Sequence, residues 1–215
     1  MKNIGILGSG SVAKALATGF LKHGYNVKLG TRNPEKLNDF LQKTNNGVSV
    51  GSFAEAAAYG DMVVLAVLGK AAAEVITLAD ERNLQSKTVI DATNPIDQSV
   101  PPVNGVLHYF TGANDSLMER LQAQFPNIHL VKAFNSVGAH LMVNPVFSEG
   151  MPTMFICGNN TEAKAEVKTI LDQFGWETDD MGAVEAARPI ESLCILWCIP
   201  GFLQNRWVQA FKMLK

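Results

Sequence analysis

The sequence of 215 residues lacks the features that mark several large classes of protein. Charged residues make up only 18% of it, and the formal net charge of −2 gives no basic surface of the kind that binds nucleic acid. The longest apolar runs, which begin at Met62 and Leu193, are too short to span a bilayer. We therefore expect neither a nucleic acid nor a membrane as partner. Because hydrophobic residues make up 47% of the chain, we expect a compact protein with a large core.

Cysteine and histidine are also scarce. The three cysteines, Cys157, Cys194 and Cys198, are an odd number without a disulfide framework, and the last two are not spaced as a CxxC redox pair. None of the four histidines lies beside a cysteine cluster, so the spacing of a metal site is absent. Gly8 and Gly10 interrupt any signal-peptide core. We expect no metal, and thiols that stay reduced in the cytoplasm.

Strand-like and helix-like segments alternate along most of the chain. Six apolar segments are typical of strands, at 3–7, 25–30, 48–50, 62–67, 87–92 and 129–134. This alternation predicts an α/β fold with a doubly wound parallel sheet, the Rossmann type that binds NAD(P), in the strand order 3-2-1-4-5-6. Two more strands, at 153–158 and 176–181, follow with a helix at 161–174 between them.

The first strand is followed by the turn GSGSVA, which matches the dinucleotide-binding fingerprint. In that fingerprint, Gly8 allows a tight turn, Gly10 lets the backbone approach a pyrophosphate, and Ala13 lets helix and strand pack closely. The pyrophosphate would lie at the helix N-terminus, where unpaired N–H groups favour an anion. The turn follows a strand and opens a helix, which is the context that supports this interpretation.

The end of the second strand indicates which dinucleotide binds. NAD sites usually carry an acidic residue there, but this strand ends in Gly30 and is followed by Thr31 and Arg32. A hydroxyl and a guanidinium would bind a 2′-phosphate, which a carboxylate would repel. If Asn33 caps the next helix, Lys36 lies in its first turn and adds a second cation. The sequence therefore predicts NADP(H) as cofactor.

Three other strand ends should meet at the cofactor. They are Ala66-Val67-Leu68, Ala92-Thr93-Asn94-Pro95 and Ala133-Phe134-Asn135-Ser136. Small residues there leave room for a flat ring, and asparagine side chains can hold a carboxamide. Ordinary punctuation between strand and loop is the alternative for each of them. The long segment that follows Pro95 is a candidate wall of the site.

The sequence offers few candidates for acid–base or nucleophilic catalysis. There is no GxSxG turn and no obvious pair of carboxylates, so we assign no catalytic residue. His140 and Asp91 are more simply explained as structural residues, and Arg188 and Glu191 as a helix pair. A hydride that moves between two stacked ring cofactors needs no strong general acid, because proximity and orientation lower most of the barrier.

With these segments in place, the chain resembles the family of NADP oxidoreductases that use the deazaflavin coenzyme, and the related cytosolic domains of the STEAP metalloreductases. The matching segments are GSGSVAKALA, TRNPEK, DATNP, VKAFNSVGAHLM and DMGAVEAARPIESL, and together they extend over nearly the whole length. The segment WCIPGFLQNRW near the C-terminus departs from the pattern for binding a deazaflavin.

The resemblance implies a role for each candidate residue. Thr31, Arg32 and Lys36 would hold the 2′-phosphate, Ala133 and Asn135 would border the nicotinamide, and a deazaflavin or flavin would stack on its exposed face. The pyrophosphate would lie against Gly8, Ser9, Gly10, Ser11 and Val12. Family members form homodimers through their C-terminal helices, which implies a homodimer here.

We therefore expect an NADP(H)-dependent oxidoreductase that passes hydride between the nicotinamide and a deazaflavin or flavin as small-molecule redox substrate. Residues 1–182 should form an NADP-binding Rossmann-like domain. From about Ala183 we expect a helical C-terminal segment, 183–215, broken at Pro189 and Pro200, which walls the substrate site or makes dimer contacts.

Two alternatives stay open. One is an NADPH-dependent reductase of a small imine or carbonyl compound, for which His140, Asp91 or Tyr109 would have to supply a proton. The other is a non-catalytic module that binds NADP(H) and senses its redox state.

Overall fold

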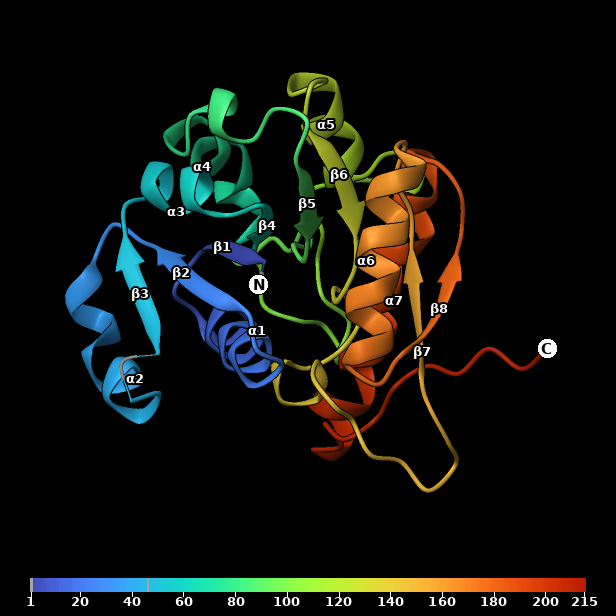
Figure 1. The fold of residues 1–215 in the computed structure, drawn as a ribbon. Coiled ribbons are helices and arrows are strands. Elements are labelled where there is room, and N and C mark those ends of the chain that lie inside the picture. Colours follow the sequence, from blue (N-terminus) through green and yellow to red (C-terminus); the bar gives the residue numbers. More distant parts are fainter. Residues whose placement is uncertain (1, 46) are drawn as a thin grey trace.

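A computed structural model describes residues 2–45 and 47–215. In that part of the chain, six strands form one parallel sheet in the order β3-β2-β1-β4-β5-β6 (Figure 1). The strands are β1 (Asn3–Leu7), β2 (Asn26–Gly30), β3 (Val48–Gly51), β4 (Met62–Leu65), β5 (Thr88–Asp91) and β6 (His129–Lys132). This is the predicted order, which is thereby confirmed. β2 and β3 are added on one side of β1, whereas β4, β5 and β6 are added on its other side. The strand order therefore switches between β1 and β4, and ligands of such folds bind at that switch point.

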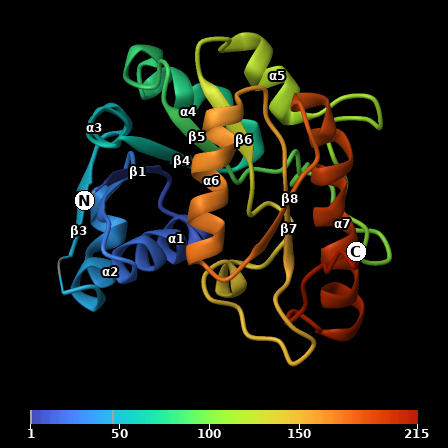
Figure 2. The ribbon, with the colours of Figure 1, turned by 45° about the vertical axis from the view of Figure 1, so that its right-hand side comes forward.

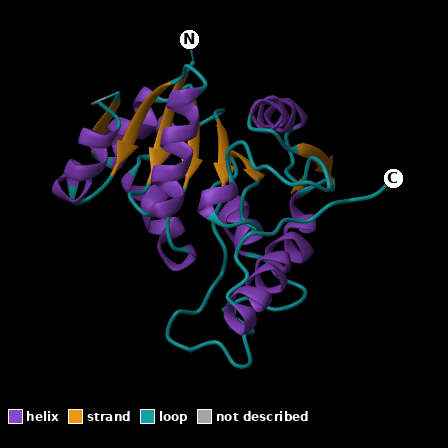
Figure 3. Cartoon of the chain, turned by 90° about the horizontal axis from the view of Figure 1, so that it is seen from below, coloured by secondary structure: helices purple, strands orange, loops and turns teal. Residues whose placement is uncertain are grey.

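Helices cover both faces of the sheet, as the view from below shows (Figure 3). They are α1 (Ser11–Lys22), α2 (Asn38–Lys43), α3 (Phe53–Tyr59), α4 (Ala72–Leu78), α5 (Leu117–Gln124) and α6 (Thr161–Gln173). One core cluster joins the sheet to α1 and α6, and the other joins it to α3, α4 and α5. Val64 on β4 belongs to the first cluster, whereas its neighbours Val63 and Leu65 belong to the second. Burial on both faces explains why β4 is apolar without alternation.

The two further strands are also present. They are β7 (Thr153–Ile156) and β8 (Glu177–Asp180), which precede and follow α6 in the sequence. The two strands pair with each other in parallel. A single antiparallel bridge between Lys132 and Cys157 joins this small sheet to the end of β6. The second sheet is therefore attached to the first at its last strand.

The starts of two helical segments differ in how they are capped, and the cap that the sequence predicts at Asn33 does not form. The Ser52 hydroxyl accepts from the Glu55 N–H at 3.2 Å, and the Glu55 carboxylate accepts from the Ser52 N–H at 2.7 Å, which makes a capping box for α3. Asn33 does precede a short 3-10 turn, Pro34–Leu37, but its side chain makes no capping hydrogen bond. Its backbone N–H instead donates to Thr31 Oγ1 at 3.2 Å.

The C-terminal segment is one helix, α7 (Ala187–Gln204), followed by extended chain. The predicted breaks are wrong. Pro189 lies in the first turn, where an N–H has no helical partner to lose, and Pro200 lies inside the helix without ending it. Residues 205–215 then run back along the small sheet, where the Thr153 N–H donates to Phe211 O at 2.8 Å.

With the turn before it, α7 is long and apolar enough to cross a membrane by length and composition alone. This stretch, Val184–Gln204, has a mean hydropathy of 1.3, with 33% of it buried. The isolated apolar run at Leu193 is shorter than this helix, which is why the sequence argued against any span. The core helix of a globular protein can meet the same test.

The long connection between β5 and α5 packs against α7, and Figure 2 shows both at the same side of the molecule. The Tyr109 hydroxyl donates to Glu191 O at 2.8 Å. The segment thus lies along the C-terminal helix, as a wall rather than a free loop.

The predicted helix pair of Arg188 and Glu191 does not form. Arg188 pairs with Glu119 on α5 at 2.6 Å, and Glu191 pairs with Lys132 on β6 at 2.8 Å. The carboxylates of Glu119 and Glu191 thus each join segments that lie far apart in the sequence, and helix spacing cannot reveal such contacts.

Lys132 is fully buried and lies between two carboxylates. Its Nζ is 2.7 Å from Asp91 Oδ2 and 2.8 Å from Glu191 Oε1, and it donates to Thr93 O at 3.1 Å. Burial by itself lowers the pKa of Lys132, but the two adjacent carboxylates outweigh it and hold that pKa above its usual value. The ammonium is therefore charged and fully paired within the core.

The substitution Lys132→Met tests how much the core depends on this charge. It leaves two buried carboxylates without their cation, so we expect the free energy of unfolding to fall by about 3–5 kcal/mol. Chemical denaturation measures the loss. The matched control is Lys168→Met, which breaks an exposed pair with Asp172 and should cost less than about 1 kcal/mol. Equal losses in the two variants would contradict the expectation.

Candidate functional site

A cavity of about 400 Å³ lies at the carboxyl ends of the central strands, around the switch between β1 and β4. It is lined by Gly8, Ser9, Gly10, Ser11, Val12, Thr31, Arg32, Asn33, Lys36, Phe53, Ala66, Val67, Leu68, Ala71, Val75 and Ala92. The first strand-to-helix turn, the end of β2 and the end of β4 therefore meet at one place. This is where the sequence predicts the dinucleotide.

The glycine turn has the geometry that its residues predict. Gly8 has φ = +141°, its N–H donates to Gly30 O at 3.0 Å, and a Cβ there would overlap Ala66 O. Only glycine fits such a position without strain. A Cβ at Gly10, by contrast, would meet no protein atom within 4 Å. Space is therefore open at the start of α1.

The N-terminus of α1 is suited to an anion. Gly10 precedes the helix without a side-chain cap, and the first turn carries no acidic residue. The first N–H groups of a helix have no partner within the helix, and they face the lined cavity here. The turn therefore fits a pyrophosphate.

A hydroxyl and two cations line the other end of the cavity. Thr31 is buried, and its hydroxyl donates to Ser9 Oγ at 3.3 Å, whereas Arg32 and Lys36 are exposed. The Arg32 guanidinium lies 3.5 Å from Glu74 Oε1 on α4. No acidic residue lies at the end of β2, so this end of the cavity fits a 2′-phosphate.

Not all predicted residues line the cavity. Asn94, Ala133 and Asn135 do not, and Ala133 is fully buried. The two asparagines bond each other: Asn94 Nδ2 donates to Asn135 O at 2.8 Å, and Asn135 Nδ2 donates to Asn94 Oδ1 at 3.1 Å. Of the strand ends expected at the cofactor, Thr93, Pro95, Phe134 and Ser136 do not line it either. The glycine turn, Thr31, Arg32, Lys36, Ala66, Val67, Leu68 and Ala92 do line it.

The sequence reasoning missed four lining residues, Asn33, Phe53, Ala71 and Val75, and the carboxylate of Glu74 beside them. Ala71, Glu74 and Val75 are three and four residues apart, which places them on one side of α4. That spacing was visible in the sequence, but the face that α4 turns toward β2 was not.

None of the three candidate proton donors lines this cavity. Asp91 is buried in its ion pair with Lys132, and Tyr109 donates to a backbone carbonyl while burial raises the pKa of its hydroxyl. His140 is exposed and lies near Gly138 and Trp197. In the described part of the chain, the lining holds no histidine, tyrosine or carboxylate.

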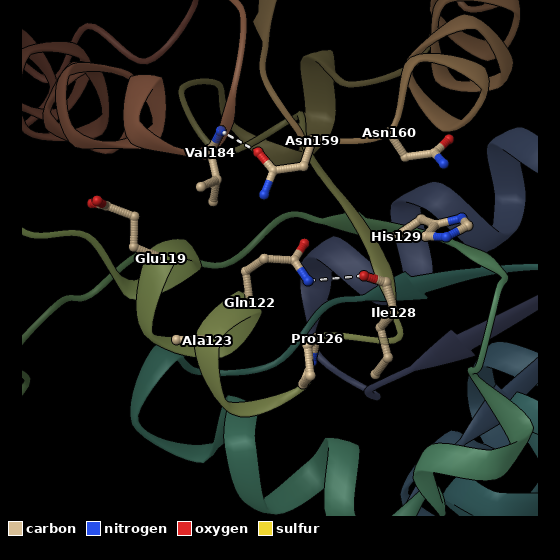
Figure 4. Close-up of a pocket in the computed structure, with 9 residues that line it drawn as sticks. All are labelled: Glu119, Gln122, Ala123, Pro126, Ile128, His129, Asn159, Asn160 and Val184. Atoms are coloured by element: carbon tan, nitrogen blue, oxygen red, sulfur yellow. Dashed lines mark hydrogen bonds between the residues drawn. The ribbon is translucent and has the colours of Figure 1, made fainter.

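A larger cavity, of about 620 Å³, lies at the opposite edge of the sheet, where β6 begins (Figure 4). Its polar side chains bond mainly to the protein itself. Gln122 Nε2 donates to Ile128 O at 3.0 Å, and Asn159 Oδ1 accepts from the Val184 N–H at 3.0 Å (Figure 4). We place the functional site at the smaller cavity, because only that one combines a glycine turn with an open helix start.

The described residues contain no group of three or more histidine, cysteine or acidic side chains that could hold a metal ion. Cys157 and Cys194 are buried and Cys198 is half-buried, all as free thiols.

Comparison with known proteins identifies the family of the chain. Residues 3–95 match the family described as NADP oxidoreductase, coenzyme F420-dependent. A solved structure from Arthrobacter sp. FB24, provisionally described as an F420-dependent NADP-reductase, has 32% sequence identity, covers 100% of both chains and superposes with a TM-score of 0.91. The chain belongs to the F420-dependent NADP oxidoreductase family. As a family member it is an NADP-dependent oxidoreductase, and the Rossmann-type fold is confirmed.

The family extends to longer proteins. Metalloreductase STEAP3 of Rattus norvegicus is 30% identical over 205 residues, which is 93% of this chain but 38% of the rat protein. The chain thus spans less than two fifths of that relative. An imine reductase from Streptomyces aurantiacus shares the fold, with a TM-score of 0.66 over 94% of this chain and 63% of the other, at 16% identity.

Proposed function

We propose that this oxidoreductase transfers hydride between NADP(H) and a deazaflavin or flavin. The observation that carries the proposal is the cavity at the sheet's switch point, which joins a glycine turn to a hydroxyl and two cations and whose lining, among the described residues, holds no histidine, tyrosine or carboxylate. An imine or carbonyl acceptor needs a proton at the reacting atom, whereas a ring acceptor stacked on the nicotinamide needs mainly the correct distance and orientation.

The cofactor residues have separate tasks in this proposal. Gly8, Ser9, Gly10, Ser11 and Val12 bind the pyrophosphate through the turn and the start of α1. Thr31, Arg32 and Lys36 bind the 2′-phosphate through charge-assisted hydrogen bonds. The middle of the dinucleotide and its adenosine end are thereby fixed about the start of α1.

We place the nicotinamide end over Ala66, Val67, Leu68 and Ala92, which line the cavity. The two alanines there leave room for a flat ring. NADPH supplies the hydride when bound, and the chain's task is to hold the ring and exclude water from its face. Asn94, Ala133 and Asn135 do not line the cavity. We assign them to positioning the carboxamide end of the nicotinamide, where the two asparagines bond each other.

We further propose that two copies of the chain associate through α7. Leu196 and Leu203 on that helix are more than half exposed, and Val103 in the connection beside it is 57% exposed. An apolar surface that is continuous over the helix and its neighbouring segment is typical of an interface. The free thiols are compatible with a cytoplasmic enzyme.

The substitution Arg32→Glu tests the 2′-phosphate assignment. It removes a cation and adds repulsion, so we expect the Kd for NADPH to rise about 10- to 100-fold, as charge-assisted hydrogen bonds are worth about 1.5–3 kcal/mol. The Kd for NADH should change by less than about threefold. Fluorescence titration measures both. Arg82→Glu, an exposed arginine paired with Asp80, is the control. Equal losses for the two nucleotides would refute the assignment.

The substitution Glu74→Gln tests a competing contact. In the structure this carboxylate holds Arg32, and it would repel the phosphate that we place beside that arginine. We expect NADPH to bind about two- to fivefold more tightly to the variant and NADH to bind as before, because exposed ion pairs are worth up to about 1 kcal/mol. Glu81→Gln is the control. Weaker NADPH binding would instead show that Glu74 orients the guanidinium.

The acceptor is tested by anaerobic oxidation of NADPH, followed optically, with the deazaflavin, FMN, FAD and a cyclic imine offered separately. We expect turnover with the deazaflavin or a flavin, and much slower turnover when NADH replaces NADPH. Turnover with the imine alone would contradict the proposal in favour of a small-substrate reductase. Selective NADPH binding without turnover on any acceptor would favour a sensing module.

A further inference from the structure

The buried cluster of Lys132, Asp91 and Glu191 fixes the segment that leaves β5. Asp91 Oδ1 accepts from the Thr93 N–H at 2.9 Å and from the Thr93 hydroxyl at 2.6 Å. Lys132 Nζ donates to Thr93 O at 3.1 Å. Thr93 is thus held on three sides, and its neighbour Ala92 lines the cavity. The cluster therefore sets the backbone beside the proposed nicotinamide site.

The same cluster fixes the C-terminal helix. Glu191 Oε2 accepts from the Leu117 N–H at 2.9 Å, and its Oε1 accepts from the Met118 N–H at 3.0 Å as well as contacting Lys132. Both oxygens therefore accept from the protein. Glu191 joins α7 to the start of α5 and to the end of β6 at one point.

The residue before Glu191 connects this point to the asparagine pair. Ile190 O accepts from Asn135 Nδ2 at 2.9 Å, and the same amide group donates to Asn94 Oδ1 at 3.1 Å. Asn135 is 4% exposed, and its Oδ1 has no hydrogen-bond partner among the described residues. A buried amide oxygen without a partner is costly unless a ligand supplies a donor. The carboxamide N–H₂ of a nicotinamide is a donor of the required kind.

The charges in the cluster do not cancel. One lysine faces two carboxylates, which leaves one net negative charge, and the N–H groups at the start of α5 offset it. Without the charge of Glu191, Lys132 and Asp91 form a neutral pair. This carboxylate can therefore be neutralised with less harm to the core than either of the other two charges.

We propose that Glu191 is a positioning residue for the nicotinamide half of NADP(H). Through Lys132 it holds the Ala92–Thr93 backbone, and through Ile190 it holds Asn135 and Asn94. This inference rests on the proposed function, since it assumes that the nicotinamide lies at these strand ends. It assigns the C-terminal helix a role in cofactor geometry although no residue of that helix lines the cavity.

The variant Glu191→Gln separates positioning from general stability. Its amide has one acceptor oxygen, so it cannot bond both Lys132 and the two α5 N–H groups in the original way. We measure the Kd values for NADPH and for 2′,5′-ADP, which carries the adenosine and 2′-phosphate without nicotinamide. We expect the Kd for NADPH to rise about tenfold, the loss of one charge-assisted hydrogen bond, while that for 2′,5′-ADP changes less than about twofold. Equal weakening of both ligands, or no change in either, overturns the proposal.

Two further variants complete the test. Glu119→Gln removes a carboxylate that also joins α5 to α7, through Arg188, but outside the buried cluster; both Kd values should stay unchanged. Thr93→Val keeps the side-chain shape and removes only the hydroxyl bond to Asp91, so it approaches the cluster from the strand side and should weaken NADPH selectively. If Thr93→Val weakens both ligands equally, positioning is refuted even where Glu191→Gln does not fold. Failure of the proposed function is seen separately, as an absence of turnover with the deazaflavin and the flavins in the anaerobic assay, which these binding measurements do not use.

Discussion

A buried ammonium group needs an acceptor for each of its hydrogens, and that requirement at Lys132 governs how the parts of this protein join. Its three acceptors come from β5, from the segment after β5 and from α7. Two of them carry negative charge, and Glu191 in turn accepts from the start of α5. The last strand of the large sheet, the helix before it and the C-terminal helix are thereby held in one register. Hydrophobic packing alone would allow these elements to slide, because it is not directional.

The cofactor end of the molecule depends on an opposite principle, the absence of contacts. The start of α1 has no side-chain cap, and the space beside Gly10 is open. Backbone N–H groups there stay available, which is what an anion requires. Gly8 permits this arrangement because its positive φ brings the chain against Ala66 without a side chain between them. The buried cluster therefore holds the strands and helices in place, while the glycine turn leaves backbone N–H groups available to an anion.

Much of the fold follows from local pattern, whereas the contacts that join its parts do not. The alternation of strand and helix segments predicts the order of all six strands, because parallel strands joined by right-handed crossovers can adopt few orders. The glycine turn and Arg32 are also readable, since the fingerprint and the strand after it are contiguous. Helix spacing predicts that Glu191 pairs with Arg188, whereas in the structure it pairs with Lys132. Local spacing cannot reveal this contact, because Lys132 lies far away in the sequence. The predicted helix breaks are wrong for two reasons: Pro189 lies in the first turn, where proline is tolerated, and Pro200 lies inside a helix that continues past it.

The place of Glu191 near the end of the chain also gives the fold an order in time. Synthesis proceeds from the N-terminus, so every residue that lines the cavity is made well before α7. At that stage Lys132 has only Asp91 as a charged partner, and the N–H groups of Leu117 and Met118 lack their carboxylate. The nascent chain can already make the bonds of Thr93 to Asp91 and Lys132, because none of these residues belongs to α7. The final helix adds the Glu191 contact to Lys132 and the Ile190 contact to Asn135.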